Sequence, residues 1–356
     1  MILRIASHRD LFQRFSIGWI LTFVVSVGIV VRGAEPDSPK SLGFTFPDEW
    51  EERQGTMMIF PQKHQYGRDA TGLREEFAAI ARAIAENEPV TVFCYSSDEE
   101  ECRRFIGETP NLTIRVGPFS IDWARDTAPM VLKGPGGELA SAGFRFNGWG
   151  RKYPGWRADV HSRDKISREM GWPIFHSDLV LEGGSIEMAG GIGIVTESSV
   201  LNPNRTNWSK EDVENELKEM LSLEEIIWIE SGLMPDPITD GHVDGLLKFV
   251  SEDTVLLHTT DDRSDVNYQI CQDAKKTLLA HSLEVVEVPL AGNVVTMNFY
   301  IGSGGSIAYV PVSGESEEEE TALEIVRQFF EVVPLKAVGL AQAGGGIHCY
   351  TQPIPL

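Results

Sequence analysis

Four segments of the chain carry apolar residues at the spacing of an amphipathic helix. The positions are Leu73, Phe77, Ile80 and Ile84; Val213, Leu217 and Leu221; Ile270, Ala274 and Leu278; and Leu323, Val326, Phe329 and Phe330. Residues three or four apart share one face of a helix, so each set predicts a helix with this face inward. Ser209 and Asp212 form a capping box before the second helix. The acidic run from Glu315 to Glu320 suits the start of the fourth, where negative charge favours the helix dipole.

Short runs rich in β-branched residues lie between these helices. Six of them predict strands: Thr91–Tyr95, Ile192–Thr196, Ile226–Glu230, Thr254–Thr260, Leu283–Pro289 and Ser306–Val312. The alternation of helices and strands predicts an α/β unit that is used several times, although without a strict sequence repeat. Neither a GxGxxG fingerprint nor a P-loop follows any of these strands, so nucleotide binding has no support.

The N-terminal segment differs from the rest of the chain. Arg4, Arg9 and Arg14 precede an apolar run from Ile17 to Val31, and Arg32-Gly33-Ala34 follows it. This is the order of a signal peptide, in which a basic region and an apolar region precede a cleavage site of small residues. The run is shorter than the ~20 residues that a membrane-spanning helix needs. Export is therefore predicted, with an uncleaved anchor and a buried core helix as the alternatives.

The predicted organisation has three parts. Residues 1–34 form the signal peptide or N-terminal anchor, and residues 35–41 form a short flexible lead-in that contains two prolines. Residues 42–356 form a single domain without a further linker-like stretch.

Acidic residues outnumber basic ones, with 53 Asp and Glu against 31 Lys and Arg and a formal net charge of −22. Residues 1–34 carry four Arg and one Asp, so the remainder has a net charge of −25. Such a protein lacks the dense basic surface that binds phosphates, which excludes nucleic acid as a partner and favours cationic ones. The 42% hydrophobic and 24% charged residues are typical of a globular protein and exclude disorder, collagen and coiled coil.

Cysteines occur at four positions, 94, 102, 271 and 349. None has the CxxC or Cys/His spacing of a zinc site, so no metal is predicted. In an oxidising compartment, Cys94 and Cys102 could pair if a turn brings them together. If Cys349 acts as a thiol it must stay free, which leaves an odd number for pairing.

Five segments combine reactive side chains with residues that let the backbone turn sharply. They are residues 122–129, 181–187, 240–244, 298–300 and 344–352. Cys349 follows three glycines and is a candidate nucleophile, although a cysteine is also commonly a small buried apolar residue. His242 and Asp244 would share one face of a strand. Such a pair can be a base with its carboxylate, half of a metal site, or a surface ion pair.

Asp126 and Glu182 add two carboxylates to these candidates. Either could be a salt-bridge partner, and Arg125 directly precedes Asp126. Together with Cys349 and His242, they suit a site for a guanidinium, because paired carboxylates match its forked N–H donors. Attack on the guanidinium carbon needs a thiolate, whose formation a neighbouring positive charge favours. A histidine can protonate the departing amine and later activate water.

The order of these motifs resembles that of the family of agmatine deiminases and Porphyromonas-type peptidylarginine deiminases. The matching stretches are Trp123-x-Arg125-Asp126-x-x-Pro129, Phe146-Asn147-x-Trp149-Gly150, Glu182-Gly183-Gly184, Leu201-Asn202-x-Asn204-Arg205, Gly241-His242-Val243-Asp244 and Gly345-Gly346-Ile347-His348-Cys349-x-Thr351-Gln352. They lie within a match from about residue 46 to residue 353. The resemblance implies a five-bladed α/β propeller, the pentein fold, with pseudo-fivefold repeats and the site at the central axis. It makes residues 42–356 a single catalytic deiminase domain and implies neither a metal nor an organic cofactor.

The resemblance also implies a role for each candidate residue. Cys349 would be the nucleophile that forms a covalent thiouronium intermediate as ammonia leaves. His242 would act as general acid and then as base, with Glu182 orienting or charging it. The substrate-binding residues would be Asp126 and Asp244 on the guanidinium and Trp123 along the channel.

The predicted reaction is hydrolysis of agmatine to N-carbamoylputrescine and ammonia, a step toward putrescine. The alternative substrate is arginine in a peptide, which an exported protein suits and which would give peptidyl-citrulline. A non-catalytic exported binder of cationic ligands and a cysteine protease are the alternatives from other classes. The expected partner is thus a small guanidine or an arginine-containing peptide, with a homo-oligomer plausible and a membrane involved only if the N-terminal segment is retained.

Overall fold

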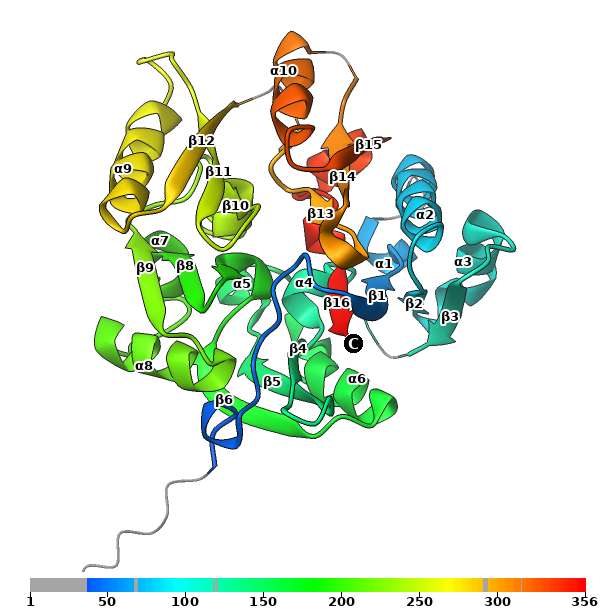
Figure 1. Cartoon of the computed structure of the whole chain (residues 1–356). Coiled ribbons are helices and arrows are strands. Elements are labelled where there is room, and N and C mark those ends of the chain that lie inside the picture. The colour runs from blue at the N-terminus through cyan, green and yellow to red at the C-terminus, as the bar shows by residue number, and fades with distance from the viewer. Residues whose placement is uncertain (1–36, 67–69, 118, 120, 291–293, 315) are drawn as a thin grey trace, which may run out of the picture. The chain divides into compact units, whose positions relative to one another are not determined.

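The computed structural model describes residues 37–66, 70–117, 119, 121–290, 294–314 and 316–356 (Figure 1). The signal peptide or anchor predicted for residues 1–34 lies outside these ranges. Residues 37–356 form one compact unit. Within the predicted lead-in, Ser38 Oγ donates to Glu219 at 2.6 Å and Lys40 Nζ donates to the Leu223 carbonyl at 2.9 Å. None of the helices in the described ranges has the length and apolar character needed to cross a membrane.

The described residues contain sixteen strands arranged in five sheets. The strands are β1 (Arg53–Ile59), β2 (Val90–Cys94), β3 (Leu112–Val116), β4 (Met130–Lys133), β5 (Leu139–Arg145), β6 (Ile174–Val180), β7 (Ile186–Ala189), β8 (Ile192–Thr196), β9 (Glu225–Ile229), β10 (Leu247–Phe249), β11 (Thr254–Thr259), β12 (Glu284–Pro289), β13 (Tyr300–Ile301), β14 (Ile307–Val312), β15 (Glu331–Lys336) and β16 (Gln352–Pro355). One sheet has the order β16-β1-β2-β3, and the other four have the orders β4-β5-β6, β7-β8-β9, β10-β11-β12 and β13-β14-β15.

The α-helices connect these strands and cover the sheets. They are α1 (Lys63–Tyr66), α2 (Thr71–Ala85), α3 (Glu99–Ile106), α4 (Ala124–Thr127), α5 (Gly148–Arg151), α6 (Ser162–Met170), α7 (Glu197–Val200), α8 (Lys210–Leu221), α9 (Asn267–Ala280), α10 (Glu317–Val326) and α11 (Val338–Ala343). Helix α2, for example, packs Phe77, Ile80 and Ile84 into one cluster with Met58 of β1 and Val92 of β2. Each fully buried side chain of this kind contributes about 1.5–3 kcal/mol to stability.

All five sheets repeat one connection. The first strand pairs antiparallel with the second, and the second pairs parallel with the third, as in β4-β5-β6. Parallel neighbours need a crossover, which α2, α6, α8, α9 and α10 supply in the five sheets. In the first sheet the C-terminal strand β16 takes the antiparallel place beside β1, with Gln352 opposite Met57. Figure 1 shows this red strand beside the blue one, so the two ends of the described chain close one sheet.

The repetitive α/β architecture predicted from the sequence is confirmed. The four predicted helices correspond to α2, α8, α9 and α10, and the six predicted strands correspond to β2, β8, β9, β11, β12 and β14. The Ser209 side chain caps α8 by accepting a hydrogen bond from the Asp212 amide at 3.1 Å. The Ser316 side chain caps α10, and residues 317–320 of the acidic run lie in its first turn.

Two details of the helix predictions are wrong. In α9, Cys271 rather than Ile270 is buried, because the inward face is centred one residue further along and continues through Ala274 and Leu278. Helix α10 ends at Val326, so Phe329 lies beyond the helix and is 36% exposed. The spacing of the apolar residues did not indicate that the helix ends at Val326.

Candidate active site

The five segments with reactive side chains occupy equivalent places in the five sheets. Each lies directly before the first strand of the repeat. Helix α4 precedes β4, and the short turns at Gly183–Ser185, Val243–Gly245 and His348–Tyr350 precede β7, β10 and β16. Asn298 precedes β13 in the same way. Segments far apart in the sequence are therefore equivalent in topology.

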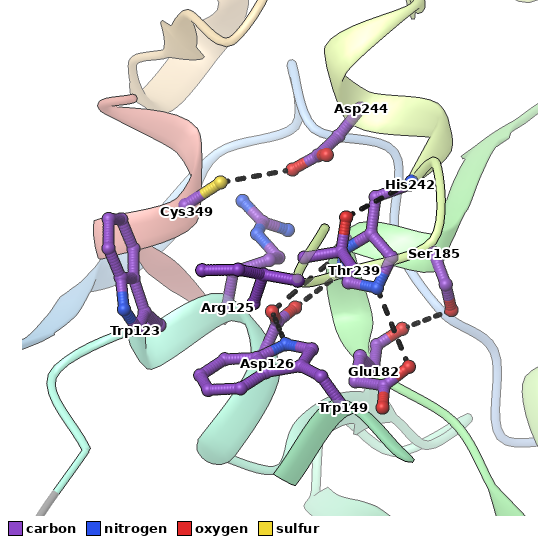
Figure 2. A network of polar contacts seen from close by, with 12 residues as sticks. Trp123, Arg125, Asp126, Trp149, Glu182, Ser185, Thr239, His242, Asp244 and Cys349 are labelled. Atoms are coloured by element: carbon purple, nitrogen blue, oxygen red, sulfur yellow. Dashed lines mark hydrogen bonds and ion pairs between the residues drawn. The ribbon is translucent and has the colours of Figure 1, made fainter. Parts of the chain in front are cut away.

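One cavity of about 520 Å³ collects these segments. Its lining includes five of the six predicted site residues, namely Trp123, Asp126, His242, Asp244 and Cys349. The sixth, Glu182, lies behind His242, and Figure 2 shows the contact between them. A larger open groove, of about 970 Å³, is lined by residues between 143 and 207 and includes neither Cys349 nor His242.

Asp244 binds the thiol of Cys349. The Sγ atom donates to Oδ2 of Asp244 at 3.4 Å, a contact drawn in Figure 2. Asn298 joins the two residues, because its Nδ2 donates to the same oxygen at 3.0 Å and its Oδ1 accepts from the Cys349 amide at 3.1 Å. Burial favours the neutral form of Asp244, but the hydrogen bond and charge of His348 outweigh it and lower the pKa of Asp244 to about 2.

The electrostatic environment disfavours the thiolate of Cys349. Burial raises the pKa of this thiol well above its ordinary value, and the negative charges of Asp244 and Asp126 raise it further. All four cysteines have free thiols, including Cys94 and Cys102, and Cys349 is partly accessible.

Asp126 forms the opposite acidic wall of the cavity. The Trp149 indole N–H donates to its Oδ2 at 2.8 Å, and the Gly184 amide donates to its Oδ1 at 2.9 Å. Burial raises the pKa of Asp126; His242 opposes this shift, while Asp244 and Glu182 add to it. The neutral form of Asp126 is thus less unfavourable than that of an exposed aspartate, and a bound cation would favour the ionised form.

His242 and Asp244 lie on a tight turn, not on a strand. Both side chains still face the cavity, because the turn Val243–Gly245 redirects the backbone before β10. His242 Nδ1 lies 3.9 Å from Asp126, and its Nε2 lies 3.5 Å from Glu182, which are charge contacts rather than short hydrogen bonds. Burial alone would lower the pKa of His242, but the carboxylates of Asp126, Glu182 and Asp244 raise it to about 9. The imidazolium is therefore the resting form.

Arg205 holds Glu182 in its ionised state. The Nε atom of Arg205 lies 2.9 Å from Oε1 of Glu182, and Nη1 lies 2.6 Å from Oδ2 of Asp240. Burial would raise the pKa of Glu182, but Arg205 and His242 outweigh it and lower it. Glu182 thus supplies a fixed negative charge behind His242.

Trp123 forms an aromatic wall beside Cys349. Its ring lies 4.4 Å from that of Tyr350, centroid to centroid, and the tryptophan is 7% exposed. A Cβ atom on Gly345 would lie only 2.4 Å from this ring, so the close approach of the two segments requires glycine. Glycine is required on the opposite side as well: a Cβ atom on Gly184 would lie 2.8 Å from Nδ1 of His242 and 2.9 Å from Oδ2 of Asp244.

The arrangement suits a planar cation held between two carboxylates, within reach of a thiol and an imidazolium. No group of three or more candidate metal-ligating side chains occurs among the described residues. Side chains that the sequence reasoning left without a role also contact the site residues: Trp149, Arg205, Asn298 and His348. All four lie in segments singled out from the sequence, but only their contacts reveal what each one holds.

The protein is thus of the α/β class. Its repeated units bring together a cysteine, a histidine and carboxylates in a site that suits a cationic ligand. The sequence profile of the Porphyromonas-type peptidyl-arginine deiminase family matches residues 45–355. The chain belongs to this family, as its motifs predict.

Individual relatives agree with this membership. An agmatine deiminase of Stutzerimonas stutzeri is 36% identical over 89% of this chain and 97% of its own. The structure of the agmatine deiminase of Enterococcus faecalis is similar with a TM-score of 0.84 and 28% identity, covering 90% of this chain and 98% of that chain. A C. jejuni agmatine deiminase with substrate bound has a TM-score of 0.80 at 22% identity, over 88% of this chain and 96% of that one, which supports the fold.

Proposed function

We propose that this protein is a hydrolase that deiminates agmatine, releasing ammonia and leaving the ureido product N-carbamoylputrescine. The observation that carries the proposal is the cavity in which Cys349, His242 and two carboxylates meet. The relatives named agmatine deiminases, matched over nearly their whole length, support agmatine as the substrate. The reaction would place the protein in putrescine synthesis.

In the first half of the reaction, Asp126 and Asp244 hold the guanidinium, whose positive charge stabilises the thiolate of Cys349 as the thiol proton passes to solvent. Sulfur then attacks the central carbon and forms a C–S bond. His242 starts as the imidazolium and protonates the departing nitrogen, so that the C–N bond breaks and ammonia leaves. The product of this half is a thiouronium on Cys349.

In the second half, the neutral His242 takes a proton from water, and the oxygen attacks the same carbon. The C–S bond breaks, which returns the thiol and leaves a C=O bond in the product. Glu182 stabilises the imidazolium in both halves, and Trp123 lines the path of the substrate chain. Two side chains, Cys349 and His242, together with water carry every proton in this sequence, so the proposal includes no metal or organic cofactor.

Arginine within a peptide is the second candidate substrate. The description of the family profile supports it, and the reacting group is the same guanidinium. The product would then be peptidyl-citrulline, and the partner an arginine-containing peptide.

The experiment that tests the function compares agmatine with a blocked arginine peptide and measures ureido product and ammonia. We expect both products from agmatine with wild-type protein, and a loss of more than about 10³-fold with Cys349→Ala. The matched control is Cys271→Ala, because Cys271 is buried in α9 away from the cavity. If wild-type protein with a free Cys349 yields no ureido product from either compound, the proposed function is wrong. Retained ligand affinity without turnover would instead identify a binding protein.

The five repeated sheets support a further part of the proposal, a five-bladed α/β propeller with the cavity at its axis. Each repeat places its site segment at the same topological position, as a pseudo-fivefold arrangement requires. A crystal structure would test the blade geometry.

Export through the N-terminal segment, with or without its cleavage, is also a proposal, which N-terminal sequencing of the protein from fractionated cells would test. Light scattering would test the proposed homo-oligomer.

A further inference from the structure

His348 directly precedes Cys349 and is 1% exposed. Its Nδ1 lies 3.0 Å from Oδ2 of Asp244, and its Nε2 lies 2.8 Å from Oε1 of Glu49. Both partners are acidic, and the pKa of each lies below its ordinary value. Each ring nitrogen of His348 is thus within hydrogen-bond distance of a carboxylate, and a carboxylate oxygen accepts the hydrogen bond that Nδ1 donates.

Glu49 anchors the far side of this link. Its Oε2 lies 2.5 Å from Lys248 Nζ, and its Oε1 lies 2.8 Å from Arg125 Nη2. Burial would raise the pKa of Glu49, but Lys248, Arg125 and His348 outweigh it and hold the pKa well below its usual range. The His348 ring is thus bound to a carboxylate that two cations fix in place.

On the near side, three donors converge on a single oxygen of Asp244. Cys349 Sγ, Asn298 Nδ2 and His348 Nδ1 all bind Oδ2. Among the described residues this pattern leaves Oδ1 of Asp244 for a ligand in the cavity. His348 itself does not line the cavity, so it acts on the site through Asp244.

We propose that His348 is a positioning residue for the reaction. By linking Asp244 to Glu49, it keeps Oδ2 on the thiol and turns Oδ1 toward the guanidinium. The proposal rests on the proposed function, because it assigns His348 to the holding of that substrate.

Two substitutions separate this role from simple packing. The amide nitrogen of His348→Asn can occupy the place of Nδ1 and donate to Asp244, whereas that of His348→Gln can reach only the place of Nε2 and donate to Glu49. We expect kcat/KM for agmatine to fall within about fivefold in His348→Asn and by about 10- to 100-fold in His348→Gln, since a charge-assisted hydrogen bond to Asp244 is lost.

Thermal stability should show the reverse order. Glutamine is closer to histidine in size, so His348→Asn leaves the larger cavity and the lower melting temperature. If His348 had a purely structural role, the variant with the lower melting temperature would also have the lower kcat/KM. Equal losses of activity, or a greater loss in His348→Asn, would overturn the proposal.

The geometry can be tested without turnover, which separates its failure from that of the proposed function. In ¹H–¹⁵N spectra of histidine-labelled wild-type protein at pH 7, we expect a ring N–H signal from Nδ1 of His348, identified by its loss in His348→Asn. This signal remains informative if no guanidine is hydrolysed. A His348 ring without a hydrogen on Nδ1 overturns the proposed link whatever the activity.

Discussion

Oδ2 of Asp244 accepts the thiol hydrogen bond of Cys349 at 3.4 Å, so the proposed nucleophile rests against a negative charge. Burial is the largest cause of the raised pKa of the Cys349 thiol, and the charges of Asp244 and Asp126 raise it further. In the ligand-free protein, Cys349 is therefore the neutral thiol. A guanidinium between the two carboxylates would offset their charge, which couples formation of the nucleophile to substrate binding.

The Asp244→Asn variant tests this relationship. Loss of the negative charge should lower the pKa of the Cys349 thiol and speed its alkylation by iodoacetamide about three- to tenfold at pH 7.5, although deimination should fall. Mass spectrometry of the modified peptide over time measures the rate. Asp253→Asn is the matched control, because this exposed aspartate lies outside the cavity lining. An unchanged alkylation rate in Asp244→Asn would contradict the electrostatic account.

Trp149 orients Asp126 from an unusual backbone conformation. Its φ of 52° lies in the region that favours glycine, and the Asn147 side chain holds the turn by accepting from the Gly150 amide at 2.7 Å. In Trp149→Phe the indole N–H to Asp126 is lost, so we expect kcat/KM to fall about tenfold or more.

Trp228→Phe is the matched control, because its indole N–H also donates to a carboxylate, that of Glu214 at 3.2 Å, away from the cavity. Steady-state kinetics should show activity within about twofold of wild type in this control. Equal losses in the two variants would argue against a specific role for Trp149.

Gly184 leaves no room for a side chain between two site residues. Its added Cβ would lie 2.8 Å from His242 and 2.9 Å from Asp244. We expect Gly184→Ala to reduce kcat/KM by at least about 10²-fold, because a displacement of a few tenths of an ångström misaligns both groups.

Gly72→Ala is the control, since its Cβ would meet no atom within 4 Å and the residue lies in helix α2. This substitution should leave activity unchanged and stabilise the protein by up to about 1 kcal/mol. Full activity in Gly184→Ala would show that the His242–Asp244 spacing tolerates movement.

The raised pKa of His242, about 9, makes stability depend on pH. A histidine with a raised folded-state pKa stabilises the protein fully below its unfolded value near 6.5 and loses this contribution as the pH rises through 9. We expect the free energy of unfolding to exceed that of His242→Asn by roughly 3 kcal/mol or less at pH 6, and the difference to shrink by pH 10.

Urea unfolding of both proteins between pH 6 and 10 measures this difference, because groups that titrate alike in the two proteins cancel. The Gly72→Ala variant serves as the control, because it removes no titratable group and its difference from wild type should stay constant over the same range. A wild-type advantage over His242→Asn that grows with pH would refute the assignment.

Local pattern was sufficient for much of the fold. The apolar spacing that gave α2 and α8, and the β-branched runs of β8 and β11, depend on neighbours a few positions away. The same reasoning misplaced the inward face of α9 and the end of α10, because the packing partners of those helices lie elsewhere in the chain. The antiparallel pairing of β16 with β1 could not be predicted from neighbouring residues, because the two strands lie near opposite ends of the domain sequence.

For the site, the sequence alone determined the chemical inventory. Cys349, His242 and the carboxylates at positions 126, 182 and 244 were recognisable from residue type, adjacent glycines and order of motifs. Only the tertiary structure decided that all of these except Glu182 line one cavity, that Oδ2 of Asp244 accepts the thiol hydrogen bond, and that the pKa of His242 rises. The reason is physical: a pKa and a hydrogen bond depend on distance and burial, which the packing of the five sheets sets between segments as far apart in the sequence as Asp126 and Cys349.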